Sequence, residues 1–340
     1  MRKFIYIIIS AIAVLLCSCE KELEYKGEYD GEKLVLFSVA SPGKKLSARV
    51  FKTEFIYQTH FPQTRSGLSG ARVYAIVNDN QVYHFYQVIS RYNADSYEYY
   101  STGLRESVEY MSDYIPKIGD HIVVKASYGD FDEVYGETVV PEKPVARMNS
   151  CNLKADSEKN TRFICNSSIT IDDPAEETNY YSIQICKKMI DYSPIDNTPS
   201  YHYDWYISLK TRDILFSNMN LTGFYNTLTV SESTIPKVFD DDRFSGQSHT
   251  FKLTNTVDFY GDPEEYEHLL DNYILTVDNF SESLYMYTKT FEDIRYIAEN
   301  GDGLTEEAVI LYSNVINGLG CVGALSGIEI NMNQYLESGF

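Results

Sequence analysis

Residues 71–89, ARVYAIVNDNQVYHFYQVI, guide the interpretation of the whole chain. Two runs rich in β-branched and aromatic residues, 71–77 and 82–89, flank the tetrapeptide Asn-Asp-Asn-Gln at 78–81. Asparagine and aspartate tolerate positive φ, so this tetrapeptide suits the turn of a β-hairpin. The stretch therefore predicts two antiparallel strands.

Further short runs with strand-like patterns lie on either side of this hairpin, at 33–39, 46–50, 122–126 and 133–140. Turn-forming residues, such as Ser41-Pro42-Gly43, separate them. Roughly six or seven short strands in a segment of this length are typical of an immunoglobulin-like β-sandwich. We predict such a sandwich over residues 33–141.

Pro141 and Pro144 mark the predicted domain boundary, because proline cannot donate to a strand ladder. One helix is predicted near 281–299, where apolar residues recur at steps of three and four and Asn279 or Ser281 can cap the start. The fold class is thus mainly β, with a second β-rich domain with one helix over 142–340. Its predicted strands are at 163–171, 181–185, 201–210, 251–257 and 273–277.

Residues 1–18 have the features of a secretory signal peptide, since two basic residues precede an apolar run at 4–16. The run is too short to span a bilayer comfortably, which takes roughly 20 residues. It ends in Leu16-Cys17-Ser18-Cys19, the pattern of a bacterial lipobox. We therefore predict cleavage before Cys19 and lipidation of this residue. An ordinary signal peptide that ends near a cysteine is the alternative.

The segment 19–32 is polar, acidic and interrupted by glycine. It cannot bury enough apolar area to fold, so it is predicted to be a lipidated, flexible tether. The lipid on Cys19 makes a membrane the first expected partner. This places the rest of the chain outside the bilayer, held by its lipid.

The mature chain is strongly acidic. Loss of Arg2 and Lys3 reduces the 29 basic residues to 27 against 49 acidic ones, a formal net charge of −22. Nucleic acid and anionic lipid surfaces would both repel such a body. The charge therefore excludes nucleic acid as an expected partner.

Common catalytic signatures are absent from the sequence, and its six histidines are scattered singly. We accordingly expect no enzymatic activity, no metal and no cofactor. Residues 240–246, DDDRFSG, superficially resemble a calcium loop. They lack the third alternating oxygen ligand and the distal glutamate, so a capped turn is the preferred interpretation.

Tyr201, Tyr203 and Trp205 share one face of a predicted strand. Aromatic rings with polar tips suit contacts with a glycan or peptide ligand, or with a protein partner. The same spacing is typical of a core face, which is the interpretation we favour. The three residues are kept as candidate contacts.

Four cysteines follow the lipidation site: Cys151, Cys165, Cys186 and Cys321. Export permits disulfides, and four thiols allow three pairings. Cys151 and Cys165 are close enough in sequence to face each other across a hairpin. Burial as four small hydrophobic residues is the alternative, and we prefer it slightly.

Three stretches together resemble a Bacteroidota lipoprotein family catalogued as a domain of unknown function. They are 169–181 (ITIDDPAEETNYY), 238–246 (VFDDDRFSG) with the strand 249–253, and 311–320 (LYSNVINGLG) with Val322-Gly-Ala324. The lipobox and the Lys33-Leu-Val opening add to the resemblance, which runs from about residue 19 to the C-terminus. Cys321 stands where the family usually has a bulky apolar residue.

The resemblance implies an accessory or ligand-capture role beside a TonB-dependent outer-membrane receptor in nutrient uptake. Glu20, Glu22 and Glu24 resemble the signal for display on the cell exterior, although Lys21 and Leu23 make the match imperfect. We therefore expect a surface-exposed outer-membrane lipoprotein. A surface enzyme that processes glycans or peptides is the alternative function.

The third stretch also carries a structural expectation. Asn317, Gly318 and Gly320 call for tight turns or close backbone approach, because glycine lacks a Cβ atom. We interpret these residues as a turn that holds the sandwich together. A partner-binding role is the weaker interpretation.

The lipobox generates the first prediction. Cys19→Ala should leave the precursor uncleaved by lipoprotein signal peptidase and unlipidated, because the thiol that receives the lipid is gone. Metabolic labelling with a palmitate analogue measures this, with Cys17→Ser as a control that keeps the acceptor. Label on the Cys19→Ala protein would refute the assignment.

Overall fold

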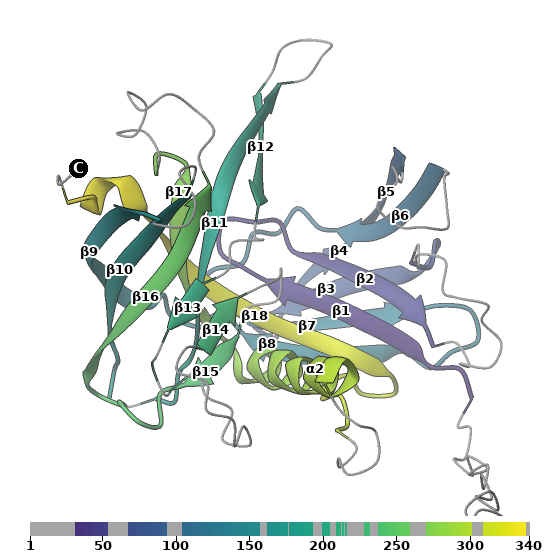
Figure 1. The fold of residues 1–340 in the computed structure, drawn as a ribbon. Helices are drawn as coiled ribbons and strands as arrows, with labels where there is room; N and C mark the ends of the chain where they lie inside the picture. The colour runs from purple at the N-terminus through teal and green to yellow at the C-terminus, as the bar shows by residue number, and fades with distance from the viewer. Residues whose placement is uncertain are drawn as a thin grey trace, which may run out of the picture. The chain divides into compact units, whose positions relative to one another are not determined.

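The computed structural model describes residues 31–53, 67–93, 104–156, 162–175, 177–192, 199–204, 209–211, 213, 215, 228–231, 237–258, 270–300 and 309–337. Lys33–Phe340 form one compact unit, separate from Met1–Glu32. The unit is mainly β, as predicted, and its elements are labelled in Figure 1. The predicted signal peptide, Cys19 and nearly all of the tether lie outside the described residues.

The described residues of the N-terminal half form eight strands: β1 (Leu34–Ala40), β2 (Ser47–Lys52), β3 (Arg72–Val77), β4 (Gln81–His84), β5 (Tyr86–Asn93), β6 (Leu104–Met111), β7 (His121–Ser127) and β8 (Val134–Val139). They form two layers, ordered β1-β2-β6-β5 and β4-β3-β7-β8. Lettered A to G in chain order, with β4 as C′, these are the ABED and C′CFG sheets of an immunoglobulin fold. The predicted N-terminal sandwich is thus found.

Alternate side chains from the two layers form the first core. Leu36 of β1 and Ile122 of β7 have no solvent-exposed surface. Tyr110 of β6 is also buried, and its hydroxyl donates to the Leu68 carbonyl at 2.6 Å and accepts from the Ala71 N–H at 2.8 Å. A buried phenol needs such partners, so this tyrosine fixes the segment that enters β3.

The C-terminal half is a second sandwich. One sheet has the order β14-β13-β16-β10-β9, and the opposite layer has the order β12-β11-β17-β18, with β15 paired to β11. The first sheet consists of β9 (Val145–Ala155), β10 (Arg162–Asp172), β13 (Leu209–Thr211), β14 (Leu228–Ser231) and β16 (Ser248–Asp258). The opposite layer consists of β11 (Tyr180–Tyr192), β12 (Pro199–Asp204), β15 (Val238–Asp240), β17 (Tyr273–Phe280) and β18 (Leu319–Asn331).

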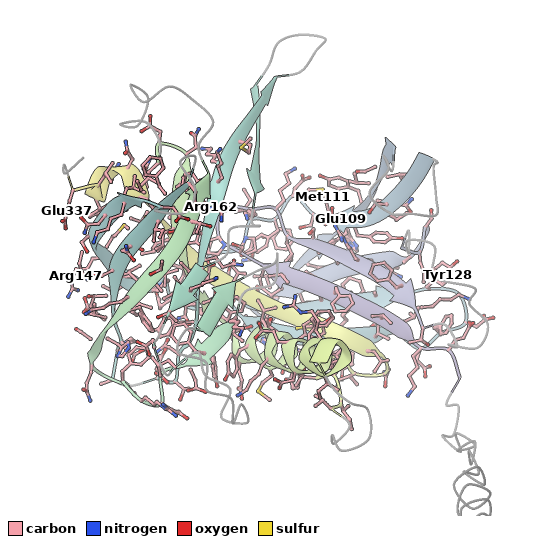
Figure 2. All side chains as sticks on the ribbon, viewed as in Figure 1. Glu109, Met111, Tyr128, Arg147, Arg162 and Glu337 are labelled. Atoms are coloured by element: carbon pink, nitrogen blue, oxygen red, sulfur yellow. The ribbon has the colours of Figure 1, made fainter. Side chains whose placement is uncertain are left out.

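The second core lies between these layers, with Ile169, Ile183, Phe251 and Leu275 fully buried. Exposed polar side chains cover the outside. Figure 2 shows Arg147 there, on β9, where its guanidinium pairs with the Asp172 carboxylate of β10. The half therefore has its own apolar interior, as a β-rich second domain should.

Strand β18 belongs to both halves. Its first residues, 319–324, pair in parallel with β1, and residues 325–331 pair antiparallel with β17. Val322 belongs to the first core, whereas Ile328 and Ile330 pack against the second. One continuous sheet, β12-β11-β17-β18-β1-β2-β6-β5, therefore runs through both sandwiches.

The segment before β18 fastens this strand to β8. The Asn314 side chain accepts the Val322 N–H at 2.9 Å and donates to the carbonyls of Val322 at 2.8 Å and Glu137 at 2.9 Å. Asn317, with a φ of 60°, donates to the Glu133 carbonyl at 3.1 Å. Two asparagine side chains thus replace ladder hydrogen bonds along the edge of the first sandwich.

Gly318 and Gly320 let β18 approach β1 backbone to backbone. A Cβ atom at Gly318 would lie 2.6 Å from the Leu34 carbonyl oxygen, and one at Gly320 would collide with the Leu36 carbonyl. Gly320 also has a φ of 118°, in the region that favours glycine. The predicted structural turn thus leads directly into the strand that joins the halves.

Helix α2 (Glu282–Asn300) confirms the predicted helix and packs on the face of the long sheet opposite the cores, beside β18 (Figure 1). Leu284, Tyr285 and Cys321 form a small third cluster with Phe280. The Ser281 hydroxyl accepts the Leu284 N–H at 3.4 Å and the Ala324 N–H at 2.9 Å, so it caps the helix and ties it to β18. No helix among the described residues is long and apolar enough to cross a membrane.

Two predicted strands are wrong in detail, because each is divided between two sheets. The run 82–89 comprises β4, paired with β3, and β5, paired with β6. The run 201–210 likewise spans β12 and β13, which belong to different sheets. The chain can pass from one sheet to the other within such a run. The alternation of apolar and polar residues does not reveal this passage, because the strands on both sides of it keep the same alternation.

The patterns also miss three long strands: β6, β9 and β18. β6 and β9 are rich in charged or polar residues, which hides their alternation. β18 contains Gly320, Gly323 and Gly327, and glycine normally argues against a strand interior. Here the glycines are required by the close packing of β1 and other neighbours.

The predicted boundary at residue 141 falls between the two cores, since Val140 belongs to the first and Met148 to the second. The first core is nevertheless completed from the far end of the chain by Val315, Val322 and Ala324. The division into two domains at residue 141 stays a prediction. The structure adds that a fragment of residues 33–141 would expose the edge of β1 that β18 covers.

The contact between β18 and β1 generates the second prediction. Gly320→Ala should cost at least about 3 kcal/mol of unfolding free energy, because a backbone carbonyl blocks the new methyl group and the φ is unfavourable. Gly43→Ala is the matched control: its φ is 82°, but nothing lies within 4 Å of the added Cβ, so roughly 1–2 kcal/mol is expected. Denaturant titration of the mature protein measures both. Equal losses would show that the close approach contributes nothing.

Candidate functional site

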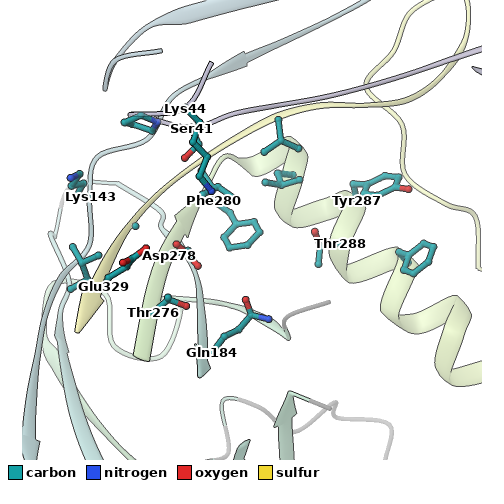
Figure 3. A pocket seen from close by; sticks show the side chains of 17 residues that line it. Ser41, Lys44, Lys143, Gln184, Thr276, Asp278, Phe280, Tyr287, Thr288 and Glu329 are labelled. Atoms are coloured by element: carbon teal, nitrogen blue, oxygen red, sulfur yellow. The ribbon is translucent and has the colours of Figure 1, made fainter. Parts of the chain in front are cut away.

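A cavity of about 650 Å³ lies on the face of the long sheet that carries α2 (Figure 3). Strands β11, β17 and β18 form its floor, and α2 forms one wall. Lys44 and Lys143 lie at its rim. The volume is within the range of small-molecule sites, which is roughly 300–1,000 Å³.

The register of the sheet explains which side chains reach the floor. Asp278 of β17 lies opposite Gly327 of β18, and Thr276 lies opposite both Gln184 of β11 and Glu329 of β18. Side chains alternate along a strand, so residues opposite one another or two apart face the same side. Four polar side chains from three strands therefore meet at one end of the cavity.

Gly327 makes room for the Asp278 carboxylate. A Cβ atom at position 327 would collide with Asp278 Oδ1. The carboxylate thus lies over the bare backbone of β18. Any side chain at 327 would displace it from the floor.

Gln184 and Thr276 are buried polar residues, and each has one side-chain atom without a hydrogen-bond partner among the described residues. Each is only 6% exposed, and within the described structure the Gln184 Nε2 and Thr276 Oγ1 atoms have no hydrogen-bond partner. An unpaired buried polar group costs about 1–3 kcal/mol, and such groups are rare in native structures. A molecule in the cavity that bonds to these atoms would remove this cost.

The charges of the cavity are also unpaired. Burial raises the pKa of Asp278 to about 7; the Lys44 charge opposes the rise and the Glu329 charge adds to it. Among the described residues, no ion pair includes Asp278, Glu329, Lys44 or Lys143. Of these four groups, only Asp278 lies away from solvent, because Glu329, Lys44 and Lys143 are exposed.

The helix side of the cavity is apolar and aromatic. It is lined by Phe280, Leu284, Tyr287, Phe291 and Leu325. The Tyr287 ring is fixed by Phe291, at a centroid distance of 6.3 Å, and by Phe37 of β1, at 5.4 Å. The site thus combines a charged, polar floor with a rigid apolar wall, as small-molecule sites commonly do.

The structure does not describe the side chains of the three aromatic candidates from the sequence. Tyr201 and Tyr203 lie on β12, paired with Ile190 and Lys188 of β11. Their side chains, and Trp205 entirely, fall outside the described residues. Their role as ligand or partner contacts stays a prediction.

Residues 240–246 form a turn held by two carboxylates. Asp241 accepts the Asn179 N–H at 3.0 Å, and Asp173 accepts the Gly246 N–H at 2.9 Å and the Tyr181 hydroxyl at 2.7 Å. Within the described ranges, no group of three or more His, Cys, Asp or Glu side chains is placed to hold a metal ion. Asp241 thus ties the turn to the backbone at Asn179, and Asp173 ties Gly246 of the turn to the Tyr181 hydroxyl.

All four described cysteines are buried. The sulfur atoms of Cys151 on β9 and Cys165 on β10 lie 3.3 Å apart, so these two are neighbours across the hairpin, as their spacing suggested. Cys186 and Cys321 lie on different strands, β11 and β18. Cys321 packs against α2, where its small size suits the close approach of the helix.

The family assignment rests on a match between residues 20–328 and the profile of the family described as "Domain of unknown function (DUF4249)". The chain belongs to this family. The match begins immediately after Cys19 and spans both sandwiches, so the shared strand β18 lies within the matched residues almost to its end. A search of curated proteins found no significant match.

Sequence reasoning missed the cavity of this DUF4249 protein. Its polar residues lie in strands without a recognisable motif, and this includes Gln184 and Thr276. The sequence has 49 acidic residues, so nothing distinguishes Asp278 and Glu329 from the others. One signal was available: Asp278 interrupts the apolar alternation of β17, YILTVDNF, on the side that faces α2. Only the register with β11 and β18 brings the partners together.

The buried carboxyl group generates the third prediction. A folded pKa near 7, above the unfolded value near 3.8, means that Asp278 stabilises the protein most at low pH and that this contribution is lost as pH rises from about 4 to 7. Asp278→Asn should therefore be more stable than the wild type by up to about 4 kcal/mol at pH 8, with little difference at pH 4. Thermal unfolding at both values measures this.

The charged side chains that line the cavity with Asp278 are Lys44, Lys143 and Glu329, and among the described side chains of α2 the titratable one in the lining is Tyr287. The exposed Asp242→Asn serves as control and should show no such pH dependence. A wild type that is as stable as Asp278→Asn at pH 8 would contradict the buried-carboxyl assignment.

Proposed function

We propose that this protein is a surface-exposed outer-membrane lipoprotein that captures a small ligand as an accessory subunit of a TonB-dependent nutrient transporter. The observation that carries the capture role is the cavity beneath α2. Its floor presents buried hydrogen-bonding atoms without partners among the described residues, on Gln184 and Thr276, beside the Asp278 carboxyl group, whose pKa is raised by burial. A purely structural subunit would have no need of such a site.

The lipobox supports the membrane attachment. A lipidated Cys19 would carry acyl chains on both its thiol and its amine, and each buried methylene contributes about 0.8 kcal/mol to membrane binding. One chain anchors a protein only marginally, whereas several together hold it permanently. The acidic residues after Cys19 resemble the signal for display on the exterior in Bacteroidota.

The tether supports the partnership with a receptor. About 13 flexible residues give a root-mean-square span of roughly 20 Å, enough for the body to lie on the rim of a neighbouring β-barrel. Confinement to one membrane raises the local concentration of both partners, so a weak contact surface suffices. The family resemblance noted from the sequence, to lipoproteins encoded beside TonB-dependent receptors, points to the same arrangement.

A surface hydrolase that processes glycans or peptides is the second candidate. The observation in its favour is the pair Asp278 and Glu329, in which one carboxyl group has a raised pKa, as acid–base catalysis requires. Incubation of the mature protein with glycans and peptides, with Asp278→Asn as control, separates the two. Turnover by the wild type alone would establish the hydrolase.

The proposed location and partnership generate the fourth prediction. Proteinase K added to intact cells should degrade the body of the protein, because it faces outward, while a periplasmic control protein survives. Affinity purification in mild detergent should recover a TonB-dependent receptor. Full protection from the protease would refute the orientation, and recovery without any such receptor would refute the partnership.

A further inference from the structure

We propose that the cavity binds a neutral sugar of one or two rings, whose hydroxyl groups bond to the Gln184, Thr276 and Asp278 side chains and whose apolar face packs on the aromatic rings beside α2. This inference rests on the ligand-capture role proposed above and names its ligand class. It is carried by the buried hydrogen-bonding atoms of the floor, by the aromatic rings of the lining and by what other ligand classes would leave unmatched.

The most buried polar side chains of the floor are uncharged. Gln184 and Thr276 are each 6% exposed, and each retains one side-chain atom without a partner in the described part of the chain. The charged groups of Lys44, Lys143 and Glu329 are by contrast exposed to solvent. Water and salt screen exposed charges, so the buried uncharged atoms decide which ligand the cavity favours.

Hydroxyl groups suit all three polar side chains of the floor. The Gln184 amide nitrogen needs an acceptor, and the Thr276 hydroxyl takes either a donor or an acceptor. The Asp278 carboxyl group, whose pKa burial raises to about 7, needs a donor when ionised and offers one when protonated. A hydroxyl group donates one hydrogen bond and accepts two, so it meets each of these demands. It also reproduces the hydrogen bonds of a water molecule that it displaces.

The strand register places these three side chains within reach of one ring. Thr276 lies directly opposite Gln184, and Asp278 follows Thr276 by two residues on the same strand. Side chains that lie opposite one another on one face of a sheet are about 5 Å apart, and those two residues apart on a strand are about 7 Å apart. A sugar ring bears hydroxyl groups on several sides, so a single ring can bond to all three.

The aromatic rings of the lining supply a surface for the apolar face of a sugar. Phe280, Tyr287 and Phe291 line the cavity (Figure 3). The Tyr287 ring contacts Phe37 at a centroid distance of 5.4 Å and Phe291 at 6.3 Å, so it is held in place before a ligand arrives. The C–H groups of a sugar ring lie on its faces, whereas its hydroxyl groups project mainly from its edge. A sugar can therefore meet aromatic rings and polar side chains at the same time.

Other ligand classes leave part of the site unmatched. A hydrocarbon chain would suit the aromatic rings but would leave the buried atoms of Gln184 and Thr276 without partners. A primary ammonium group offers no acceptor to the Gln184 nitrogen. An extended peptide carries a donor and an acceptor at nearly every residue, and these pair best with the edge of a sheet. The cavity floor is the face of a sheet and offers side chains instead.

The test is isothermal titration calorimetry at pH 7 on the mature lipoprotein, in a detergent whose headgroup is not a sugar. The sugar probes are glucose, galactose, mannose, xylose, maltose, lactose and cellobiose. The comparison probes are the zwitterion phenylalanyl-alanine and the uncharged N-acetyl-phenylalanyl-alaninamide. At least one sugar should bind, and both peptides should bind at least tenfold more weakly than the best sugar.

Two variants remove the buried polar atoms at nearly constant volume. Thr276→Val and Gln184→Met should each weaken binding of the best sugar at least tenfold. Thr276→Val should leave the ligand-free protein at least as stable in thermal unfolding, because its hydroxyl has no partner among the described residues. Thr170→Val is the matched control, since this buried strand threonine bonds to Thr250 at 2.7 Å and to Asn149 at 2.8 Å. It should lower the stability and leave sugar binding unchanged.

The outcomes are distinct. A peptide that binds as tightly as the best sugar, no binding of any sugar, or sugar binding that both cavity variants leave unchanged would each overturn the sugar assignment. The receptor purification described above tests the transporter role separately. A recovered receptor with no sugar binding refutes this inference alone, whereas sugar binding without a receptor refutes only the partnership.

Discussion

The parallel pairing of β1 with β18 is the interaction on which the rest of the structure depends. It joins the first described strand to the last one, and it is close because Gly318 and Gly320 carry no side chains where the carbonyls of Leu34 and Leu36 lie. Asn314 secures the other side of β18 through three hydrogen bonds. If this ladder opened, the first core would lose Val322 and Ala324 and the two sandwiches would no longer share a sheet.

The same strand positions the cavity. One face of β18 contributes to the two cores, and the other carries Cys321 against α2 and then Gly327 and Glu329 at the cavity floor. Ser281, bonded to the Ala324 N–H, fixes where α2 begins. The helix therefore covers one part of the sheet and leaves the neighbouring part open. The site is a consequence of where the helix cap is attached.

Much of the fold could be predicted from local patterns, and the failures have physical causes. The hairpin turn is correct: Asn78 and Asp79 have φ values of 49° and 65°, which only a few residue types tolerate. The helix is correct because its period and its Ser281 cap are both local. β18 is missed because its glycines serve contacts with β1 and Asp278, which no local pattern reveals. The cavity is missed for the same reason, since Asp278, Gln184 and Glu329 become neighbours only through strand pairing.

The shared strand also has a consequence for how the protein acquires its fold as the chain is made. A chain that emerges from its N-terminus presents β1 long before β18 has been made, and its outer edge stays open until the end of the chain arrives. Open edges invite pairing with other chains, and contacts between distant segments form slowly. The N-terminal sandwich is therefore incomplete until the last strand has emerged, and the native topology closes only then. A chaperone that holds unfolded chains would act on this protein over that whole interval.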